Sequence, residues 1–402
     1  IAGSQAEVSS IVRRFAESQW GRGNCSVLLS GQRLQPSGAA LANATMANAL
    51  DIDDGHRLTK GHPGAVVFPA VLAAAEDCQA TGEQFLISLL VAYEVAIRAG
   101  VLVHQLRPEY HCTGSWGALG AAAGVARILG LTAEQTEHAL GIAEYHSTYS
   151  PMMRCIDHPS MLKDGIGWGS MAGISSAYLA REGFTGIPSL FSFAEAEEFV
   201  SELGHVHRIE HLYFKPYACC RWAQPAVEGV KQLVAENGIS HRLVEKIVIR
   251  TFTESARLMK GVPANTEEAQ YNLYFPIAAC LVFGEVGPRQ VLQELDSETV
   301  HSVMRKIVTE TDPRLSAEFP RKALCQVEIF TSDGRAFVSP VMQAKGDYDH
   351  PLTTAEKKDK FFWLTEPIIG KARSALLLER IENVEQLATI SELTGAIPVG
   401  ET

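Results

Sequence analysis

Residues 41–76 read LANATMANALDIDDGHRLTKGHPGAVVFPAVLAAAE, in which two alanine-rich apolar segments flank a loop of acids and a histidine. The alanines predict two helices that pack closely against neighbouring backbones, the second over about residues 66–76. The loop between them contains Asp51, Asp53, Asp54 and His62. Burial of acids and imidazoles is unfavourable unless they are paired, which makes this loop a candidate functional site. The alternative is that Asp53 and Asp54 cap helices and that His62 is a hydrogen-bonded turn histidine.

Composition limits the classes of function. The chain has 402 residues, of which 46% are hydrophobic and 20% charged, as expected for a globular protein of two or three domains. The formal net charge of -11 argues against nucleic acid or an anionic membrane as a partner, so an anionic substrate needs a local cationic pocket. We expect no membrane span, because no apolar run approaches the ~18 residues required. No signal peptide is recognised at the start, and a cytoplasmic location is expected.

Cysteines and clustered histidines do not predict a metal centre. None of the eight cysteines forms a C-x-x-C pair, which favours a reduced cytosolic protein over a disulfide scaffold. Cys219 and Cys220 are adjacent, and they are either small buried residues or a redox pair. His205, His207 and His211 lack the spacing typical of zinc ligands. We therefore expect no metal and no disulfide framework.

The chain changes character near residue 210. Before it, apolar periodicity predicts only helices, over residues 4–20, 83–102, 118–129, 132–143 and 170–182, with residues 151–169 irregular. After it, we expect helices over residues 222–236 and 271–283, a strand over 245–251 and a hairpin with an Asp-Gly turn over 326–339. Residues from 353 onward are expected to form a helix that folds back on the first region.

The segment that leads into the helix at residues 118–129 is a further candidate site for binding a carboxylate. His111, Thr113 and Gly114 precede that helix, and a helix N-terminus offers free backbone N–H groups to a carboxylate.

These motifs, taken in order, resemble the MmgE/PrpD family over nearly the whole chain. The family includes 2-methylcitrate dehydratase, cis-aconitate decarboxylase and iminodisuccinate epimerase. The segments that resemble it are residues 48–54 (NALDIDD) with 61–63 (GHP), 111–117 (HCTGSWG), 214–217 (FKPY), 267–271 (EEAQY), and 345–347 (KGD) with 350–353 (HPLT).

The resemblance implies a mainly α fold. It predicts a large all-helical domain built from both chain ends, residues 1–209 and 345–402, and a smaller α+β lid domain, residues 210–344. It also implies a homodimer, a small carboxylate substrate and no organic cofactor.

Transferred by motif, the catalytic positions are Asp51, His62, His111, Lys163 and Lys215. For Lys163 the alternative is a surface lysine, because the loop around it is irregular. The predicted substrate-binding residues are Asp54, Gly55, Thr113 and Arg221. The family commonly has Thr or Ser at the position of Gly55, so a hydroxyl is lost there. The dehydratase branch often reads His-Pro-Ser-Asp-Asn where this chain has His62-Pro63-Gly64-Ala65-Val66, which argues against 2-methylcitrate.

The family reactions all make or protonate a carbanion next to a carboxylate, which requires an acid or base and fixed positive charge. We expect His62 to exchange the proton while Asp51 orients its ring. Lys163, Lys215 and Arg221 are expected to bind carboxylates, and His111 to donate a hydrogen bond or a proton. The sequence thus predicts a cofactor-independent lyase, a dehydratase or decarboxylase, acting on a small di- or tricarboxylate. The alternatives are a dicarboxylate epimerase or isomerase and a non-catalytic, carboxylate-binding relative.

Overall fold

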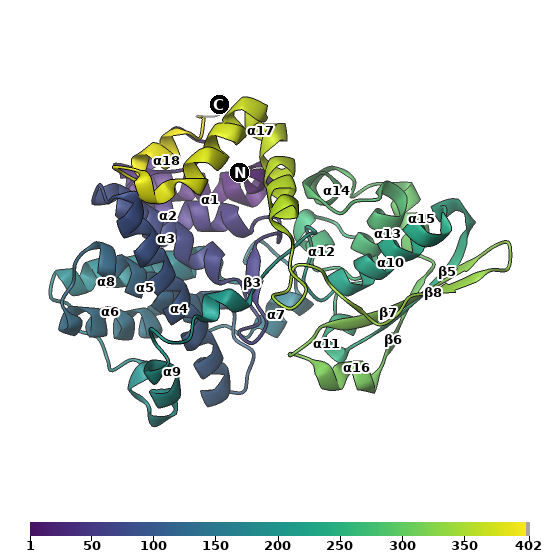
Figure 1. Ribbon diagram of the computed structural model, residues 1–402, viewed down its shortest axis with the longest axis horizontal. Coiled ribbons are helices and arrows are strands. Elements are labelled where there is room, and N and C mark those ends of the chain that lie inside the picture. The colour runs from purple at the N-terminus through teal and green to yellow at the C-terminus, as the bar shows by residue number, and fades with distance from the viewer. Residues whose placement is uncertain (399–402) are drawn as a thin grey trace.

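The computed structural model describes residues 1–398 and is mainly helical, with some sheets (Figure 1). Helices fill the first half of the chain almost completely. They are α1 (Glu7–Trp20), α2 (Pro36–Asn48), α3 (Pro63–Asp77), α4 (Gly82–Leu106), α5 (Thr113–Ile128), α6 (Ala133–His146), α7 (Met152–Asp157), α8 (Ile166–Arg181) and α9 (Glu197–Ser201).

Helix α5 is the centre of this helical part, and it packs against α3, α4, α6 and α8. Its small residues make that packing close. A Cβ added at Gly120 would come within 2.4 Å of the Ala96 side chain of α4, and one added at Gly117 would lie 3.0 Å from Val66 of α3. The alanine and glycine content that distinguished these segments in the sequence is therefore explained by helix–helix contact.

Helix α4 corrects one expectation from the sequence. With 25 residues and a mean hydropathy of 2.0 over 18 of them, it is long and apolar enough to cross a membrane by length and composition. The prediction that no apolar run approaches this length was wrong. Glu94 and Arg98 interrupt the apolar run in the sequence, but they lie one turn apart in the helix and neutralise each other as an ion pair. Just over half of that window, 56%, is buried within the protein, as is typical of a core helix.

The second part of the chain contains a five-stranded sheet, in the order β6-β5-β7-β8, with β9 also paired to β7. Strand β5 runs parallel to β6 and antiparallel to β7, and helix α10 packs against β7. The strands of this sheet are β5 (Val244–Thr251), β6 (Ile307–Thr311), β7 (Leu324–Thr331), β8 (Ala336–Val338) and β9 (Met342–Gln343), whereas β4 (Leu212–Phe214) belongs to a separate two-stranded pair. The helices are α10 (Gln224–Asn237), α11 (Thr253–Ala256), α12 (Thr266–Gln270), α13 (Tyr274–Phe283), α14 (Pro288–Gln293), α15 (Glu298–Met304) and α16 (Pro313–Glu318).

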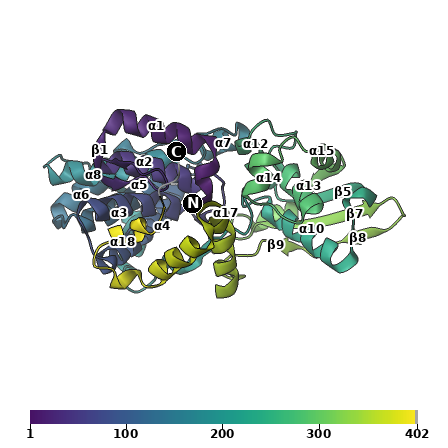
Figure 2. The same ribbon diagram turned by 90° about the horizontal axis from the view of Figure 1, so that it is seen from above.

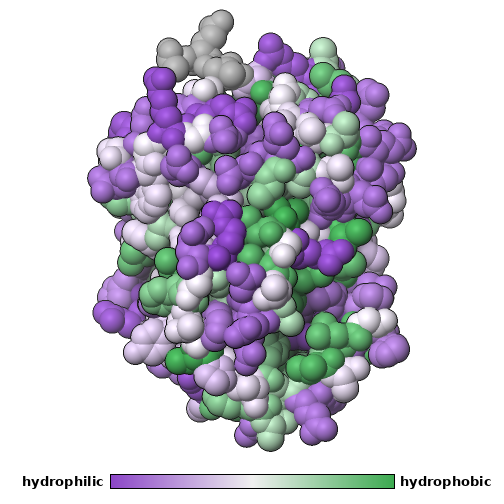
Figure 3. Space-filling model, turned by 90° about the vertical axis from the view of Figure 1, so that its left-hand side faces the viewer, coloured by the Kyte–Doolittle hydropathy of each residue, from purple (hydrophilic) through white to green (hydrophobic). Residues whose placement is uncertain are grey.

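The C-terminal helices α17 (Thr354–Glu382) and α18 (Ser391–Gly395) return to the helical part, as expected (Figure 2). The Leu387 carbonyl accepts a hydrogen bond from Gly82 N at the start of α4, and the Thr394 hydroxyl donates one to Glu76 in α3. Figure 3 looks onto the helical end of the molecule, where hydrophobic residues gather across the middle of the face among polar ones.

The predicted helices and the Asp-Gly hairpin are confirmed to within a few residues. Short elements were missed. Among them are α7 in the segment expected to be irregular, the strands β1 (Arg22–Ser26), β2 (Arg33–Leu34), β3 (Asp54–His56) and β6, and the helices α14, α15 and α16. One buried apolar cluster includes Val8 and Leu50 together with Val327 and Ile329 of the sheet, so it crosses the predicted boundary at residue 210. The division into two domains stays a prediction.

Candidate active site

The acidic loop between α2 and α3 is held against a second segment by a pair of short strands. Strand β3 pairs antiparallel with β4, with Gly55 opposite Tyr213. Lys215 follows β4 directly, so this pairing delivers its side chain to the loop. Asp51 has a φ of 50°, which is unusual for a residue with a side chain and marks a backbone that the surrounding fold imposes.

The Lys215 ammonium is the centre of the cluster. Its Nζ lies 2.8 Å from Asp51 Oδ1, 3.1 Å from the Asp51 carbonyl oxygen, and 3.5 Å from both Asp53 Oδ1 and His62 Nε2. The side chain is 0% exposed. Burial lowers the pKa of Lys215, but Asp51 and Asp53 outweigh it and the pKa is raised overall. Burial likewise raises the pKa of Asp51, but Lys215, Lys163 and His62 outweigh it and bring that pKa to about 2. The pair is therefore a buried, fully charged ion pair.

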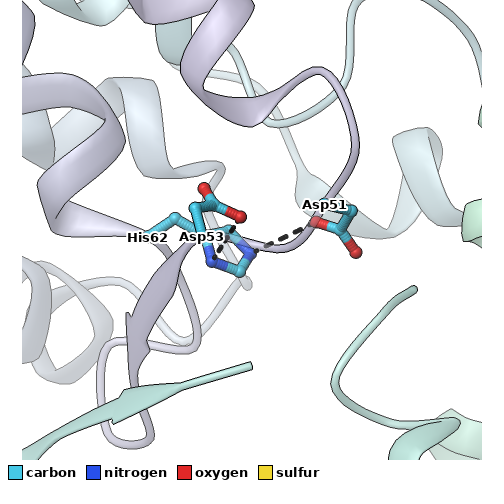
Figure 4. A group of neighbouring side chains, drawn as sticks. All are labelled: Asp51, Asp53 and His62. Carbon is cyan, nitrogen blue, oxygen red and sulfur yellow. Dashed lines mark ion pairs between the residues drawn. The ribbon is translucent and has the colours of Figure 1, made fainter. Parts of the chain in front are cut away.

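The tautomer of His62 follows from its hydrogen bonds. Its Nδ1 lies 2.7 Å from the backbone carbonyl oxygen of Asp54, and because a carbonyl can only accept, Nδ1 carries a proton. Nε2 is then the nitrogen that gains or loses a proton, and it lies 3.8 Å from Asp51 Oδ1. Asp53 Oδ1 lies 3.8 Å from Nδ1, so each ring nitrogen faces a carboxylate (Figure 4). This geometry suits a proton exchanger.

Thr113 supports His62 from the N-terminus of α5. The backbone N–H of His62 donates to Thr113 Oγ1 at 3.1 Å, and both N and Oγ1 of Thr113 donate to the carboxylate of Asp164. Burial raises the pKa of Asp164 to about 6. Thr113 was predicted to bind substrate. In the structure its hydroxyl is hydrogen-bonded to His62 and Asp164, and this arrangement positions the histidine.

Asp54 points away from the cluster. Its Oδ1 accepts from Gly64 N at the start of α3, and its Oδ2 accepts from the Tyr93 hydroxyl at 2.9 Å. Burial raises the pKa of Asp54 to about 6. The geometry favours the capping alternative for Asp54 over the predicted substrate contact. Asp53 instead accepts a hydrogen bond from the Asn48 side chain and faces the lysine.

A cavity opens beside this cluster, and Asp51 and His62 lie on its wall. Its polar lining also includes Lys60, Tyr213, Arg221 and Asp347. The remaining lining is His56, Arg57, Tyr110, Met152, Ile156, Cys220, Trp222, Tyr271, Phe319, Pro320 and Ala323.

Arg221, which was predicted to bind substrate, lies on the cavity wall, where its guanidinium is held by several protein groups. It forms an ion pair with Asp347 at 2.9 Å and donates to Gln224 and to the carbonyl oxygens of Ala344 and Lys345. Its guanidinium also lies 4.7 Å from the centre of the Tyr213 ring, which it helps to fix. Gly55 leaves room for that ring, because a Cβ there would meet Tyr213 Cζ at 2.2 Å.

Lys163 is buried, so the alternative of a surface lysine is wrong. Its ammonium donates to the Asn48 carbonyl oxygen at 2.6 Å and to the Gln270 side chain, and it lowers the pKa of Asp51 from close by. It does not line the cavity described above. His111 does not line it either; its ring packs 4.7 Å from Tyr149, and neither ring nitrogen has a hydrogen-bond partner within residues 1–398. The catalytic roles of Lys163 and His111 stay predictions. The His111 side chain has no hydrogen bond or ion pair with Asp51, Asp53, His62 or Lys215 within the described residues.

The same cluster contains the one group of potential metal ligands found in the described part of the chain: Asp51, Asp53 and His62. The Lys215 ammonium contacts an atom of all three, so it takes the position of a cation among them. A divalent ion there would face a buried positive charge, which makes the donor set a poor fit for a metal.

All eight cysteines are free, and burial raises the pKa of Cys220 to about 12, which argues against a redox pair with Cys219.

Two family models match the chain: the MmgE/PrpD N-terminal domain over residues 1–199 and the MmgE/PrpD C-terminal domain over residues 217–386. The chain belongs to the MmgE/PrpD family. Among similar proteins is the cis-aconitate decarboxylase-like protein oryM of Aspergillus oryzae, 26% identical over 99% of this chain and 89% of that protein. The cis-aconitate decarboxylase of Aspergillus terreus is 23% identical over 92% of this chain and 83% of its own length, and that of Homo sapiens is 24% identical over 98% and 86%.

For this MmgE/PrpD protein, the structure brings together Asp51, His62 and Lys215. Asp51, His62 and Arg221 line the cavity, whereas the fully buried Lys215 lies behind its wall. Sequence reasoning missed Asp53 as a direct member of the cluster, although its two-residue spacing from Asp51 was a usable signal. It also missed Lys60 and Tyr213 on the cavity wall. Lys60 had a weak signal, as a lysine two residues before His62; Tyr213 had none, because its position depends on the pairing of β3 with β4.

Proposed function

We propose that the protein is a cofactor-independent carboxy-lyase that removes carbon dioxide from a small unsaturated tricarboxylate of the cis-aconitate class. The observation that carries the proposal is the position of His62 Nε2, a proton-exchanging atom 3.5 Å from the buried Lys215 ammonium and on the wall of a cavity. The cis-aconitate decarboxylases among its relatives support the choice of reaction.

Decarboxylation breaks a carbon–carbon bond and leaves its electron pair on the substrate. In an unsaturated tricarboxylate that pair spreads over the neighbouring double bond and its carboxylate, giving an enolate-type anion. The fixed charge of Lys215, held in place by Asp51, stabilises this anion without reorganisation during the reaction.

Protonation completes the reaction at carbon. His62 in its charged form gives the proton from Nε2, while Nδ1 keeps its hydrogen bond to the Asp54 carbonyl. The neutral ring then regains a proton from water. Each ring nitrogen has a carboxylate 3.8 Å away, and these two negative charges offset the repulsion between the imidazolium and the Lys215 ammonium 3.5 Å from Nε2.

The same proposal includes the features that resemblance to the family implies. These are a smaller α+β domain, residues 210–344, that acts as a lid on the helical domain, a homodimer, and a cytoplasmic location.

Proton NMR in deuterium oxide tests the reaction on a panel of cis-aconitate, citrate, 2-methylcitrate and iminodisuccinate. We expect cis-aconitate to lose carbon dioxide and the product to carry one deuterium at the protonated carbon. Loss of water from a panel member would replace the proposal with a hydro-lyase. Deuterium exchange with nothing eliminated would replace it with an epimerase, and no change in any compound would favour a non-catalytic, carboxylate-binding relative.

A further inference from the structure

Lys60 is a cation on the cavity wall that belongs to none of the site's ion pairs. It lies in the same loop as His62, and its φ of 53° is unusual for a residue with a side chain. Its ammonium lies 4.5 Å from the centre of the Tyr110 ring. The Tyr110 hydroxyl donates a hydrogen bond to the Lys60 carbonyl oxygen, so one residue holds both the backbone and the side chain of the lysine.

The arginines that line the cavity, and the adjacent Lys215, are paired with carboxylates. Arg57 pairs with Asp349 at 3.1 Å, Arg221 with Asp347 at 2.9 Å, and Lys215 with Asp51 at 2.8 Å. Within residues 1–398, the Lys60 ammonium has neither an ion pair nor a hydrogen bond. The cavity wall therefore carries one positive charge whose partner the described protein does not provide.

The surroundings of Lys60 make that charge effective. An aromatic wall extends from Tyr110 to Trp222, with ring centres 6.2 Å apart, and on to Phe319 at 5.7 Å. Apolar walls exclude water and strengthen an electrostatic contact within the cavity. Burial lowers the pKa of Lys60, and Glu254 only partly opposes this, so an anion bound beside the ammonium would favour its charged form.

We infer that Lys60 binds a carboxylate group of the substrate and gives the site its preference for substrates with several carboxylates. This inference rests on the proposed function, since it concerns the same cavity. Lys60 and His62 are two residues apart on one loop and line one cavity, so a single small ligand can contact both.

The test compares Lys60→Met and Lys60→Arg with the parent protein by isothermal titration calorimetry at fixed ionic strength. The probes are tricarballylate, a saturated tricarboxylate, and glutarate, which is the same chain without the central carboxylate. Lys231→Met is the matched control, because Lys231 also lies over a tyrosine ring, Tyr217 at 5.1 Å, but is exposed and lies outside the cavity.

We expect Lys60→Met to weaken tricarballylate binding by about 10- to 100-fold, as for loss of a charged hydrogen bond, and Lys60→Arg to restore most of it. Weakening for tricarballylate alone assigns the central carboxylate to Lys60, and weakening for both probes assigns a terminal one. Unchanged affinity in Lys60→Met, or a loss that Lys60→Arg does not restore although its unfolding midpoint equals that of the parent, overturns the inference.

Turnover of cis-aconitate separates this inference from the proposed function. If the parent enzyme decarboxylates cis-aconitate and Lys60→Met has the same KM as the parent, the proposed function stands and the role of Lys60 is refuted. If the parent binds tricarballylate through Lys60 but does not turn over cis-aconitate, the role of Lys60 stands and the proposed function is refuted. A parent that neither binds nor reacts refutes both.

Discussion

Removal of the Lys215 ammonium tests whether the buried ion pair organises the site. At an effective dielectric constant of about 20, unit charges 2.8 Å apart attract each other by about 6 kcal/mol, and charges 3.5 Å apart by about 5 kcal/mol. Desolvation of the charges offsets much of this attraction. Lys215→Met leaves Asp51 buried without its ion-pair partner, and we expect the free energy of unfolding to fall by about 3–5 kcal/mol.

The matched experiment is a double-mutant cycle with Asp51→Asn. Because the double variant contains neither charge of the pair, it should lose less stability than the sum of the single variants, by at least about 1.5 kcal/mol. Urea unfolding followed by both circular dichroism and fluorescence measures these free energies, provided that the two transitions coincide. Lys231→Met, at an exposed lysine, should lie within about 0.5 kcal/mol of the parent.

The pH dependence gives an independent check of the same pair. The folded pKa of Asp51 is lowered to about 2, so its contribution to stability is present above its unfolded pKa and is lost as the pH falls through 2. In Lys215→Met, burial is no longer opposed by the lysine and the pKa of Asp51 rises, so the stability gap between parent and variant should narrow from pH 5 to pH 3. Additive single effects in the cycle, or a gap that stays constant over this pH range, would refute the reasoning.

Three further predictions concern the residues around this pair. His62→Ala should retain the parental unfolding midpoint but lose at least about 100-fold in kcat/KM, because proton transfer is removed; turnover within about tenfold of the parent would exclude His62 as the proton donor. Gly55→Ala places a Cβ 2.2 Å from Tyr213 Cζ and should lower the free energy of unfolding by about 1–3 kcal/mol. The same change should have a smaller effect in a Tyr213→Ala background, and an equal effect would show that the ring is not the obstacle. The raised pKa of Asp164, about 6 when folded, makes the parent lose stability as the pH rises from about 4 to 6, by up to about 3 kcal/mol. Asp164→Asn, which keeps an acceptor for Thr113 N, should flatten this slope in unfolding curves measured across that range, and a slope equal to the parental one would contradict the assignment.

Much of the helical architecture was predictable because it depends on local patterns. The Asp-Gly hairpin turn is encoded within four or five residues and is found as expected. The Thr132 N-cap and the helix end at Gly238 depend on equally local patterns. The short strands β3 and β4 were not predictable. Each has three residues, and their pairing joins segments more than 150 positions apart, so neither periodicity nor propensity identifies them.

The same distinction separates the site residues. Asp51 and His62 stood out because polar residues between two apolar helices are rare, and Lys215 was found by its motif. The orientation of Asp54 could not be predicted, because it depends on whether a carboxylate turns towards Lys215 or towards Tyr93 of α4, and the sequence around Asp54 is equally compatible with both. His111 follows the family motif, yet its ring lies between His104 and Tyr149, because the backbone at His111 bridges to Pro151.

The structure gives a steric reason for the glycine at residue 55. In the sequence, a glycine where the family commonly has Thr or Ser removes a hydroxyl from the loop that contains Asp51 and Asp53. In the structure, the space beside Gly55 is filled by the end of the Tyr213 ring, whose hydroxyl oxygen would lie 2.3 Å from a Cβ at residue 55. A threonine or serine at residue 55 is therefore incompatible with this position of Tyr213, which itself lines the cavity. The Tyr213 ring also lies under the guanidinium of Arg221, so its position affects both the shape and the charge environment of the cavity wall. A change of substrate relative to the cis-aconitate decarboxylases would thus be expected to depend on Gly55 and Tyr213 as a pair, since a side chain at residue 55 requires the Tyr213 ring to move or to be replaced by a smaller residue.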